Sequence, residues 1–246
     1  MISRTDSLVV ELQLPKLIVR VRFPFGAPSE KNMNRDRLIK ITGLVFNLFL
    51  FISSMVVFFR ILFAPEGDVA LFRYFTNLCN IYIGIISLVI FIFSLIYFKK
   101  EYVLPKWLRI LELSGVASLL LTFFTVLFFI GPITISEGNN FFDLYRNDMF
   151  LFHFLNPLIS LFTFLFFTRG EKLSWKEDMF GMIPMVIYSI FYTMFVISGI
   201  WDDFYGFTFG GNNWLLPISL FVMYGVTYLI SFLSSFTYNK IEGKKE

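Results

Sequence analysis

Six apolar stretches, separated by short polar connectors, dominate the pattern of hydrophobic and polar positions along the chain. They cover residues 41–63, 71–97, 108–131, 149–168, 179–200 and 213–236. A helix that crosses the hydrocarbon core of a bilayer, about 30 Å thick, needs about 20 mostly apolar residues. The apolar residues do not alternate with polar ones, which argues against a β-barrel, and backbone groups in lipid must be satisfied within their own segment. The sequence therefore predicts an all-α integral membrane bundle of six transmembrane helices within residues 33–240.

Basic residues are distributed unequally between the two sides of this predicted bundle. Eighteen Lys and Arg lie in the N-terminal segment, the second and fourth connectors and the C-terminal segment, whereas only Arg60, Arg73 and Arg146 lie on the other side. Lys and Arg accumulate on the cytoplasmic side of membrane proteins. We therefore expect both termini, including the short tail 241–246, to be cytoplasmic. The abundance of Phe, Ile, Asn and Lys is typical of an AT-rich genome and points to a bacterial plasma membrane.

The first 32 residues form neither a signal peptide nor a convincing amphipathic helix. Codons allowed by Val21-Arg22-Phe23 match the T-arm consensus of a transfer RNA gene, and Pro28 allows CCA. One hypothesis is that translation begins at Met33 and that residues 1–32 are not translated. The alternative is a genuine basic cytoplasmic tail.

Composition excludes several classes of protein. Hydrophobic residues make up 57% of the 246 positions and charged residues 16%, too few charges for a soluble monomer and too much apolar surface for disorder. A single Cys and a single His exclude a disulfide framework and multi-histidine zinc sites. A net charge of +3 does not favour nucleic acid as a partner, and no P-loop or His-Glu-x-x-His motif is present. We expect no metal and no cofactor, and the lipid bilayer as partner.

Two polar clusters lie at matching depth in the second and fourth predicted helices. Arg73, Thr76 and Asn80 share one α-helical face in and just before YFTNLCN (74–80). A second polar set shares one face in and just after LFHFLNPL (151–158): His153, Asn156, Pro157 and Ser160. Thr76 and His153 each lie five residues, or about 7.5 Å, inside the outer end of their helix. Two polar faces at one depth are expected to meet inside the bundle.

These residue types can support acyl transfer. Pro157 cannot donate a hydrogen bond to the carbonyl of His153, so a kink is expected beside the only imidazole. His153 would act as the base and Thr76 as the nucleophile, while the amides of Asn77, Asn80 and Asn156 are the candidate oxyanion donors. The alternative is that these Thr and Asn side chains only hold helices together, as is common in membrane proteins.

Three other polar positions have structural interpretations. Glu112 is expected to be a carboxylate that snorkels near Arg109, and Cys79 is expected to pack in the core. Asp202 and Asp203 lie in the fifth connector, where they would either orient His153 or simply be solvated.

With Thr in the second helix and His in the fourth, the chain resembles the androgen-induced and androgen-dependent TFPI-regulating protein family. It is most similar to a bacterial branch of six-span proteins with Tyr-Phe-Thr and Leu-x-His-x-x-x-Pro patterns. The resemblance covers residues 41–236. It implies a transmembrane threonine hydrolase of fatty acid esters, with a lipid-like small-molecule substrate, Thr76 as nucleophile and His153 as base.

A non-catalytic function is a separate hypothesis. The chain has the length and number of spans of a substrate-capture component of an importer. Such components carry small residues on the first helix, where this chain has ITGLVFNLFLFISSMVVFF. A structural membrane protein without a ligand is the third alternative.

Overall fold

The computed structural model describes residues 8–14, 17–23, 30–64, 71–98 and 103–242. The chain divides into two compact units, Met1–Ile39 and Lys40–Glu246. In the first unit, β1 (Leu8–Leu14) pairs antiparallel with β2 (Leu17–Phe23). The tail predicted over 1–32 thus contains a hairpin that was not predicted, although the Val and Ile of LIVRVRF favour a strand. The start at Met33 stays a prediction.

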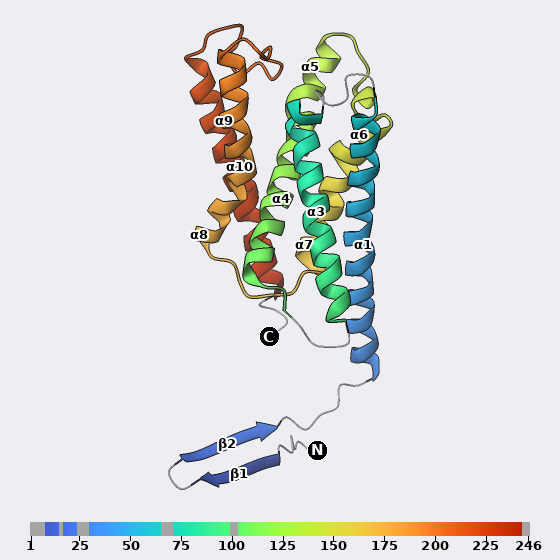
Figure 1. Ribbon diagram of the computed structural model, residues 1–246, viewed down its shortest axis with the longest axis vertical. Helices are drawn as coiled ribbons and strands as arrows, with labels where there is room; N and C mark the ends of the chain where they lie inside the picture. The colour runs from blue at the N-terminus through green and yellow to red at the C-terminus, as the bar shows by residue number, and fades with distance from the viewer. Residues whose placement is uncertain (1–7, 15–16, 24–29, 65–70, 99–102, 243–246) are drawn as a thin grey trace. The chain divides into compact units, whose positions relative to one another are not determined.

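Within the described residues, six helices are long and apolar enough to cross a membrane, which confirms that part of the predicted fold (Figure 1). Three of them are continuous α-helices: α1 (Glu30–Leu62), α3 (Phe75–Ile96) and α10 (Leu215–Glu242). Helix α1 begins in the first unit. The third is built from α4 (Lys106–Thr125), η1 (Val126–Ile130) and α5 (Gly131–Ser136). The fourth consists of α6 (Asp148–Phe150), η3 (Leu151–Leu155) and α7 (Asn156–Phe166), after the short η2 (Phe141–Tyr145). The fifth consists of α8 (Trp175–Asp178), η4 (Met179–Met182) and α9 (Ile183–Ile197).

The three segmented helices each contain a proline just after a non-α turn. Pro132 follows the π-helical turn η1, Pro157 follows the π-helical turn η3, and Pro184 follows the 3-10 turn η4. Proline lacks the N–H that an α-helix needs and its ring clashes with the carbonyl four residues earlier. A change of turn type accommodates the ring while the helix continues through the membrane. The third helix therefore runs beyond the predicted end at residue 131, to Ser136.

Helix α4 lies at the centre of the bundle and packs against α3, α7, α10 and η4 (Figure 1). Its small residues allow close approach, as is usual between membrane helices. A Cβ added to Gly115 would lie 2.5 Å from Ile83 of α3, so no larger residue fits there without a shift.

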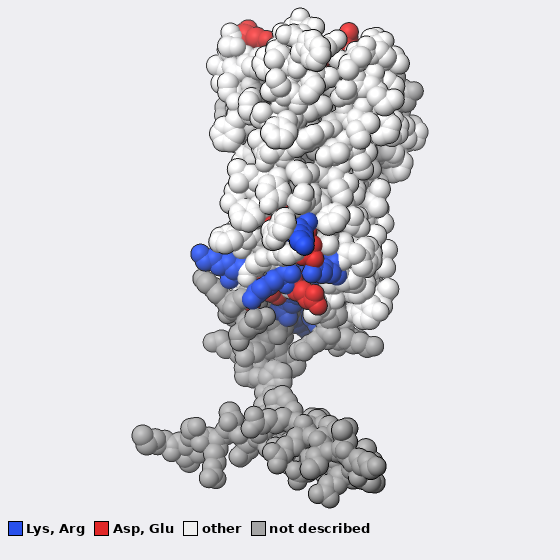
Figure 2. Space-filling model, turned by 90° about the vertical axis from the view of Figure 1, so that its left-hand side faces the viewer, with Lys and Arg blue, Asp and Glu red and all other residues white. Residues whose placement is uncertain are grey.

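Charged side chains gather at the two ends of the helices. On the face that Figure 2 displays, a broad band without Lys, Arg, Asp or Glu separates acidic residues at one end from a mainly basic region at the other. We call these the acidic end (Glu137, Asp143, Asp148, Asp202 and Asp203) and the basic end (Lys106, Lys172, Lys176 and Lys240). The uncharged band carries many exposed Phe, Ile and Leu side chains, as a surface that faces lipid requires.

Candidate functional site

Two buried asparagines join the second and fourth membrane-crossing helices in the half of the bundle toward the acidic end. Asn156 of α7 donates from Nδ2 to Oδ1 of Asn80 in α3 at 2.9 Å. Ser53 of α1 donates to Oδ1 of Asn156 at 2.8 Å, which brings in a third helix. Neither asparagine side chain is exposed. We call this set of contacts the Asn80–Asn156 bridge.

Both N–H groups of the Asn80 side-chain amide are engaged in hydrogen bonds. Its Nδ2 donates to the carbonyl oxygens of Thr76, at 2.8 Å, and of Phe152, at 3.4 Å. An asparagine amide has only two N–H groups, so Asn80 has no free donor for an oxyanion in this arrangement. The same bonds support the interpretation of Asn80 and Asn156 as residues that hold helices together. Asn77, which is buried one residue after Thr76, and Asn156, whose Nδ2 donates to Asn80, stay predicted oxyanion donors.

The bridge also places Thr76 and the π turn of His153 at one depth. Because one amide nitrogen contacts both carbonyls, the backbone oxygens of Thr76 and Phe152 lie within about 6 Å of each other. Thr76 is the second residue of α3 and its side chain is half-buried. Among the described residues, no hydrogen bond joins Thr76 to His153.

His153 is half-buried and its ring is oriented by the connector before α6. Nδ1 lies 3.1 Å from the carbonyl oxygen of Leu144 in η2. A carbonyl only accepts, so Nδ1 carries the hydrogen in this bond, and in the neutral ring Nε2 then keeps its lone pair. A neutral imidazole with a free Nε2 is the form that a general base requires.

The π turn changes which residues of the fourth helix face the core. The α-helical period puts His153 on one face with Asn156 and Ser160, whereas in the structure Phe152 takes that position and is fully buried. A π turn holds one residue more than an α turn, so the buried face shifts by one residue at η3. His153 consequently lies beside the buried face and contacts the η2 connector.

The connector between α9 and α10 fixes the start of α3. Tyr205 accepts a hydrogen bond from the backbone N–H of Phe75 at 3.0 Å, and Tyr188 of α9 donates to the carbonyl of Arg73 at 2.7 Å. These bonds position the residues immediately before Thr76.

Asp203 organises this same connector. It accepts from the backbone N–H groups of Phe207 and Thr208, at 3.0 and 2.6 Å, and from the hydroxyls of Thr208 and Tyr192. Burial alone would raise the pKa of Asp203, but the hydrogen bonds from Thr208 and Tyr192 hold it below its usual value. Asp203 therefore stabilises its own connector and makes no hydrogen bond to His153 in the described structure. Asp202 is fully exposed at 3.7 Å from Arg73.

A second polar cluster, at the basic end, was not predicted as a site. Glu112 does not snorkel to the surface as expected but is buried, with its two carboxylate oxygens 2.7 and 2.9 Å from the Thr168 hydroxyl. Arg109 is also fully buried, and its guanidinium stacks on the Tyr238 ring at 4.5 Å. The sequence could have indicated this site, because Arg109 and Glu112 carry opposite charges three residues apart inside a predicted membrane segment. Ionisable residues are rare in such segments and usually mark a functional site. The connector between α7 and α8, which contains Gly170, covers Arg109 and lies far from it in the sequence, so the local pattern does not predict this contact.

Comparisons of the chain with protein-family models, with curated proteins and with solved structures found no match. What the described residues establish is a multi-pass membrane protein with six helices long and apolar enough to span a bilayer.

Proposed function

We propose that this chain is a membrane-embedded hydrolase of lipid-soluble esters, with Thr76 as the nucleophile and His153 as the general base. The observation that carries the proposal is the Asn80–Asn156 bridge, because it holds the first turn of α3 against the π turn of the fourth helix. The resemblance to transmembrane threonine hydrolases assigns the same two residues.

The chemistry follows from the hydrogen bond at Leu144. Nε2 of His153 takes the proton of the Thr76 hydroxyl while Oγ1 attacks the ester carbonyl, and the imidazolium then returns that proton to the departing alkoxide. Water, deprotonated by the same imidazole, hydrolyses the acyl-threonine. Asn77 is the proposed donor to the oxyanion. The absence of a direct Thr76–His153 hydrogen bond is compatible with this scheme, because catalytic hydrogen bonds are often long before substrate binds.

An apolar groove of about 350 Å³ lies next to the bridge; its walls suit an acyl chain, and neither Thr76 nor His153 lines it. Phe46 of α1 lines one side, and residues between Leu158 and Leu165 of α7 line the other. The groove begins two residues beyond Asn156, so it runs from the level of the bridge toward the basic end. The Lys and Arg at the basic end support the proposal that this end and both termini are cytoplasmic, in a bacterial plasma membrane.

A non-catalytic membrane protein is the second candidate. The observation that favours it is the saturation of the Asn80 amide, together with the hydrogen bond from Ser53 to Asn156. A polar network that joins three helices is what helix association in lipid requires even without catalysis.

Labelling of membranes with a fluorophosphonate probe, followed by peptide mass spectrometry, distinguishes the two candidates. The hydrolase predicts an adduct on Thr76 that disappears in Thr76→Ala and in His153→Gln. Thr134→Ala is the matched control, because the Thr134 hydroxyl also lies toward the acidic end but donates to the carbonyl of Ile130 in its own helix. Labelling that persists in Thr76→Ala would refute the nucleophile.

A further inference from the structure

Arg109 has unfilled hydrogen-bonding capacity inside the protein. Its side chain is fully buried, and Nη1 donates to the carbonyl of Glu171. Among the described residues, neither Nε nor Nη2 has a hydrogen-bond partner. Buried charged groups are normally paired, because leaving them unpaired costs free energy. Two orphan nitrogens on one guanidinium therefore call for an acceptor.

The two orphan nitrogens lie on the same edge of the guanidinium. The N–H of Nε and one N–H of Nη2 point in parallel, and this edge holds two oxygens of one carboxylate or phosphate. Among the described residues, no carboxylate fills the edge: Glu112 contacts Thr168, and Glu171 and Glu242 interact with Arg109 through their charges without a hydrogen bond to Nε or Nη2. Tyr238 covers the face of the guanidinium and leaves this edge unused.

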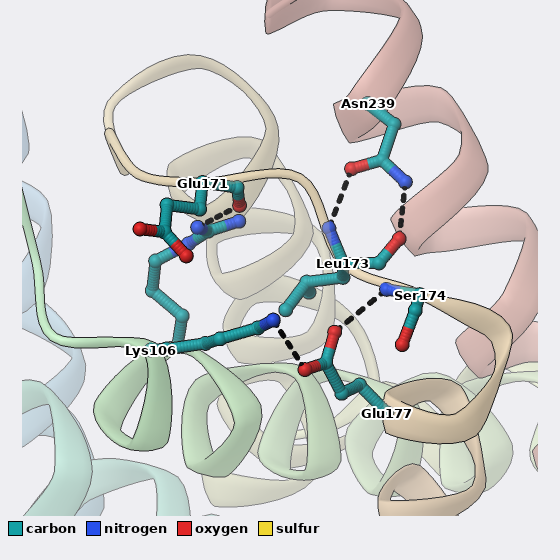
Figure 3. Close-up of polar contacts among 7 residues, drawn as sticks. Lys106, Glu171, Leu173, Ser174, Glu177 and Asn239 are labelled. Atoms are coloured by element: carbon teal, nitrogen blue, oxygen red, sulfur yellow. Dashed lines mark hydrogen bonds and ion pairs between the residues drawn. The ribbon is translucent and has the colours of Figure 1, made fainter.

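The surroundings of Arg109 place this edge at the depth of lipid headgroups. Arg109 lies in the first turn of α4, one turn from Lys106, whose ammonium pairs with Glu177 at 2.6 Å (Figure 3). Trp107 and Trp175 are both well exposed at this end of the bundle. Exposed tryptophans next to basic residues are typical of the membrane–water interface, where phospholipid phosphates lie.

A short connector, residues 169–174, separates Arg109 from the outside, and we call it the strap. A Cβ on Gly170 would lie 2.4 Å from Cδ and Nη1 of Arg109, so the backbone of Gly170 rests directly on the guanidinium. Helix α10 holds the strap at two points: Tyr238 donates to the carbonyl of Gly170 at 2.9 Å, and Asn239 exchanges two hydrogen bonds with Leu173 (Figure 3). Because the backbone of Gly170 lies against the guanidinium, we expect access to Arg109 to involve movement of the strap at Gly170.

We propose that the free edge of Arg109 is a binding site for a phosphate-type oxyanion, supplied by a phospholipid headgroup or by a free phosphate. The site is distinct from Thr76 and His153 and does not depend on the hydrolase. Binding would satisfy both orphan nitrogens at once and would lock the strap against α4 and α10.

The test uses the full chain, purified in detergent and delipidated, and measures the shift of its thermal unfolding midpoint on titration. Three arms distinguish the source of the oxyanion: dioleoyl phosphatidylglycerol, inorganic phosphate, and dioleoylglycerol, which lacks a phosphate. Wild type is expected to respond to phosphatidylglycerol and not to dioleoylglycerol. A response to inorganic phosphate alone would assign the edge to a free anion. Absence of any response, or equal responses to both lipids, would overturn the proposal.

Variants assign the response to Arg109. Arg109→Lys keeps the charge but loses the two parallel donors, so the apparent affinity is expected to fall by about tenfold or more. Lys172→Gln removes an exposed charge from the same strap and should bind as wild type does. If Arg109→Lys does not fold, Gly170→Ala decides: its Cβ displaces the guanidinium, and binding should weaken. Wild-type affinity in a folded Arg109→Lys or Gly170→Ala protein would refute the site.

Discussion

Asn156 and Asn80 hydrogen-bond to each other across α7 and α3, with 2.9 Å between Nδ2 and Oδ1. Each is fully buried, and each has further partners, Ser53 for Asn156 and two backbone carbonyls for Asn80. The pair is the central contact between the helix that carries Thr76 and the helix that carries His153.

Replacement of Asn156 by Ala should destabilise the bundle. The change leaves Asn80 Oδ1 without its donor in a dry interior, whereas the Ser53 hydroxyl keeps the Leu50 carbonyl as an acceptor, so we expect a loss of about 1–2 kcal/mol in the free energy of unfolding. Reversible unfolding in mixed micelles measures this loss. Asn139→Ala, at an exposed position in the α5–α6 connector, is the control and should change little. Equal stability of Asn156→Ala and wild type would contradict the bridge.

Replacement of Pro157 by Ala should impair ester hydrolysis without loss of stability. Alanine restores the N–H and removes the ring clash, so the π turn is free to relax to an α turn and to rotate His153 away from its bond to Leu144. The expected initial rate is at least about tenfold lower, since misplacement by about 1 Å can cost 100-fold. Pro184→Ala changes the corresponding proline of the fifth helix and should keep the rate. A fully active Pro157→Ala would show that the π turn does not position His153.

Acidification should weaken the α9–α10 connector through Asp203. Its folded-state pKa is lowered, so the stabilisation is complete above the unfolded-state pKa of about 3.9 and is lost as the pH falls through the lower folded value. Thermal midpoints at pH 7 and pH 3 measure the effect in wild type and in Asp203→Asn. The variant should be less stable at pH 7 and should lose less on acidification. An identical acid-induced loss in both proteins would exclude Asp203 as its source.

The six helices and their approximate limits could be predicted from the sequence, because each apolar stretch has the length of about 20 residues that a membrane-spanning helix needs. The matching depth of Thr76 and His153 also follows, because it depends only on the rise along two helices. The face of His153 does not, because the α-helical period fails at the π turn before Pro157. The burial of Glu112 depends on Thr168, which is 56 residues away along the chain, and so is not visible in the local pattern.

The proposed orientation predicts which connectors are reached from outside the cell. Cys79, the single cysteine, is buried, so Cys79→Ala provides a background for introduced cysteines. A membrane-impermeant maleimide should label Glu137→Cys on intact cells and Lys172→Cys only after permeabilisation, because Lys and Arg mark the cytoplasmic side. Labelling of Lys172→Cys on intact cells would contradict the proposed orientation.

The most direct test of the proposed function is the rate of ester hydrolysis by the purified chain in lipid nanodiscs. The substrate is a long-chain fatty acid ester, and Thr76→Val and His153→Gln are compared with wild type and with Thr134→Ala. Wild type and Thr134→Ala should hydrolyse the ester at equal rates, whereas each of the other two variants should be at least about 100-fold slower. Hydrolysis by Thr76→Val at the wild-type rate, or no hydrolysis by a folded wild-type protein, would contradict the assignment of Thr76 and His153.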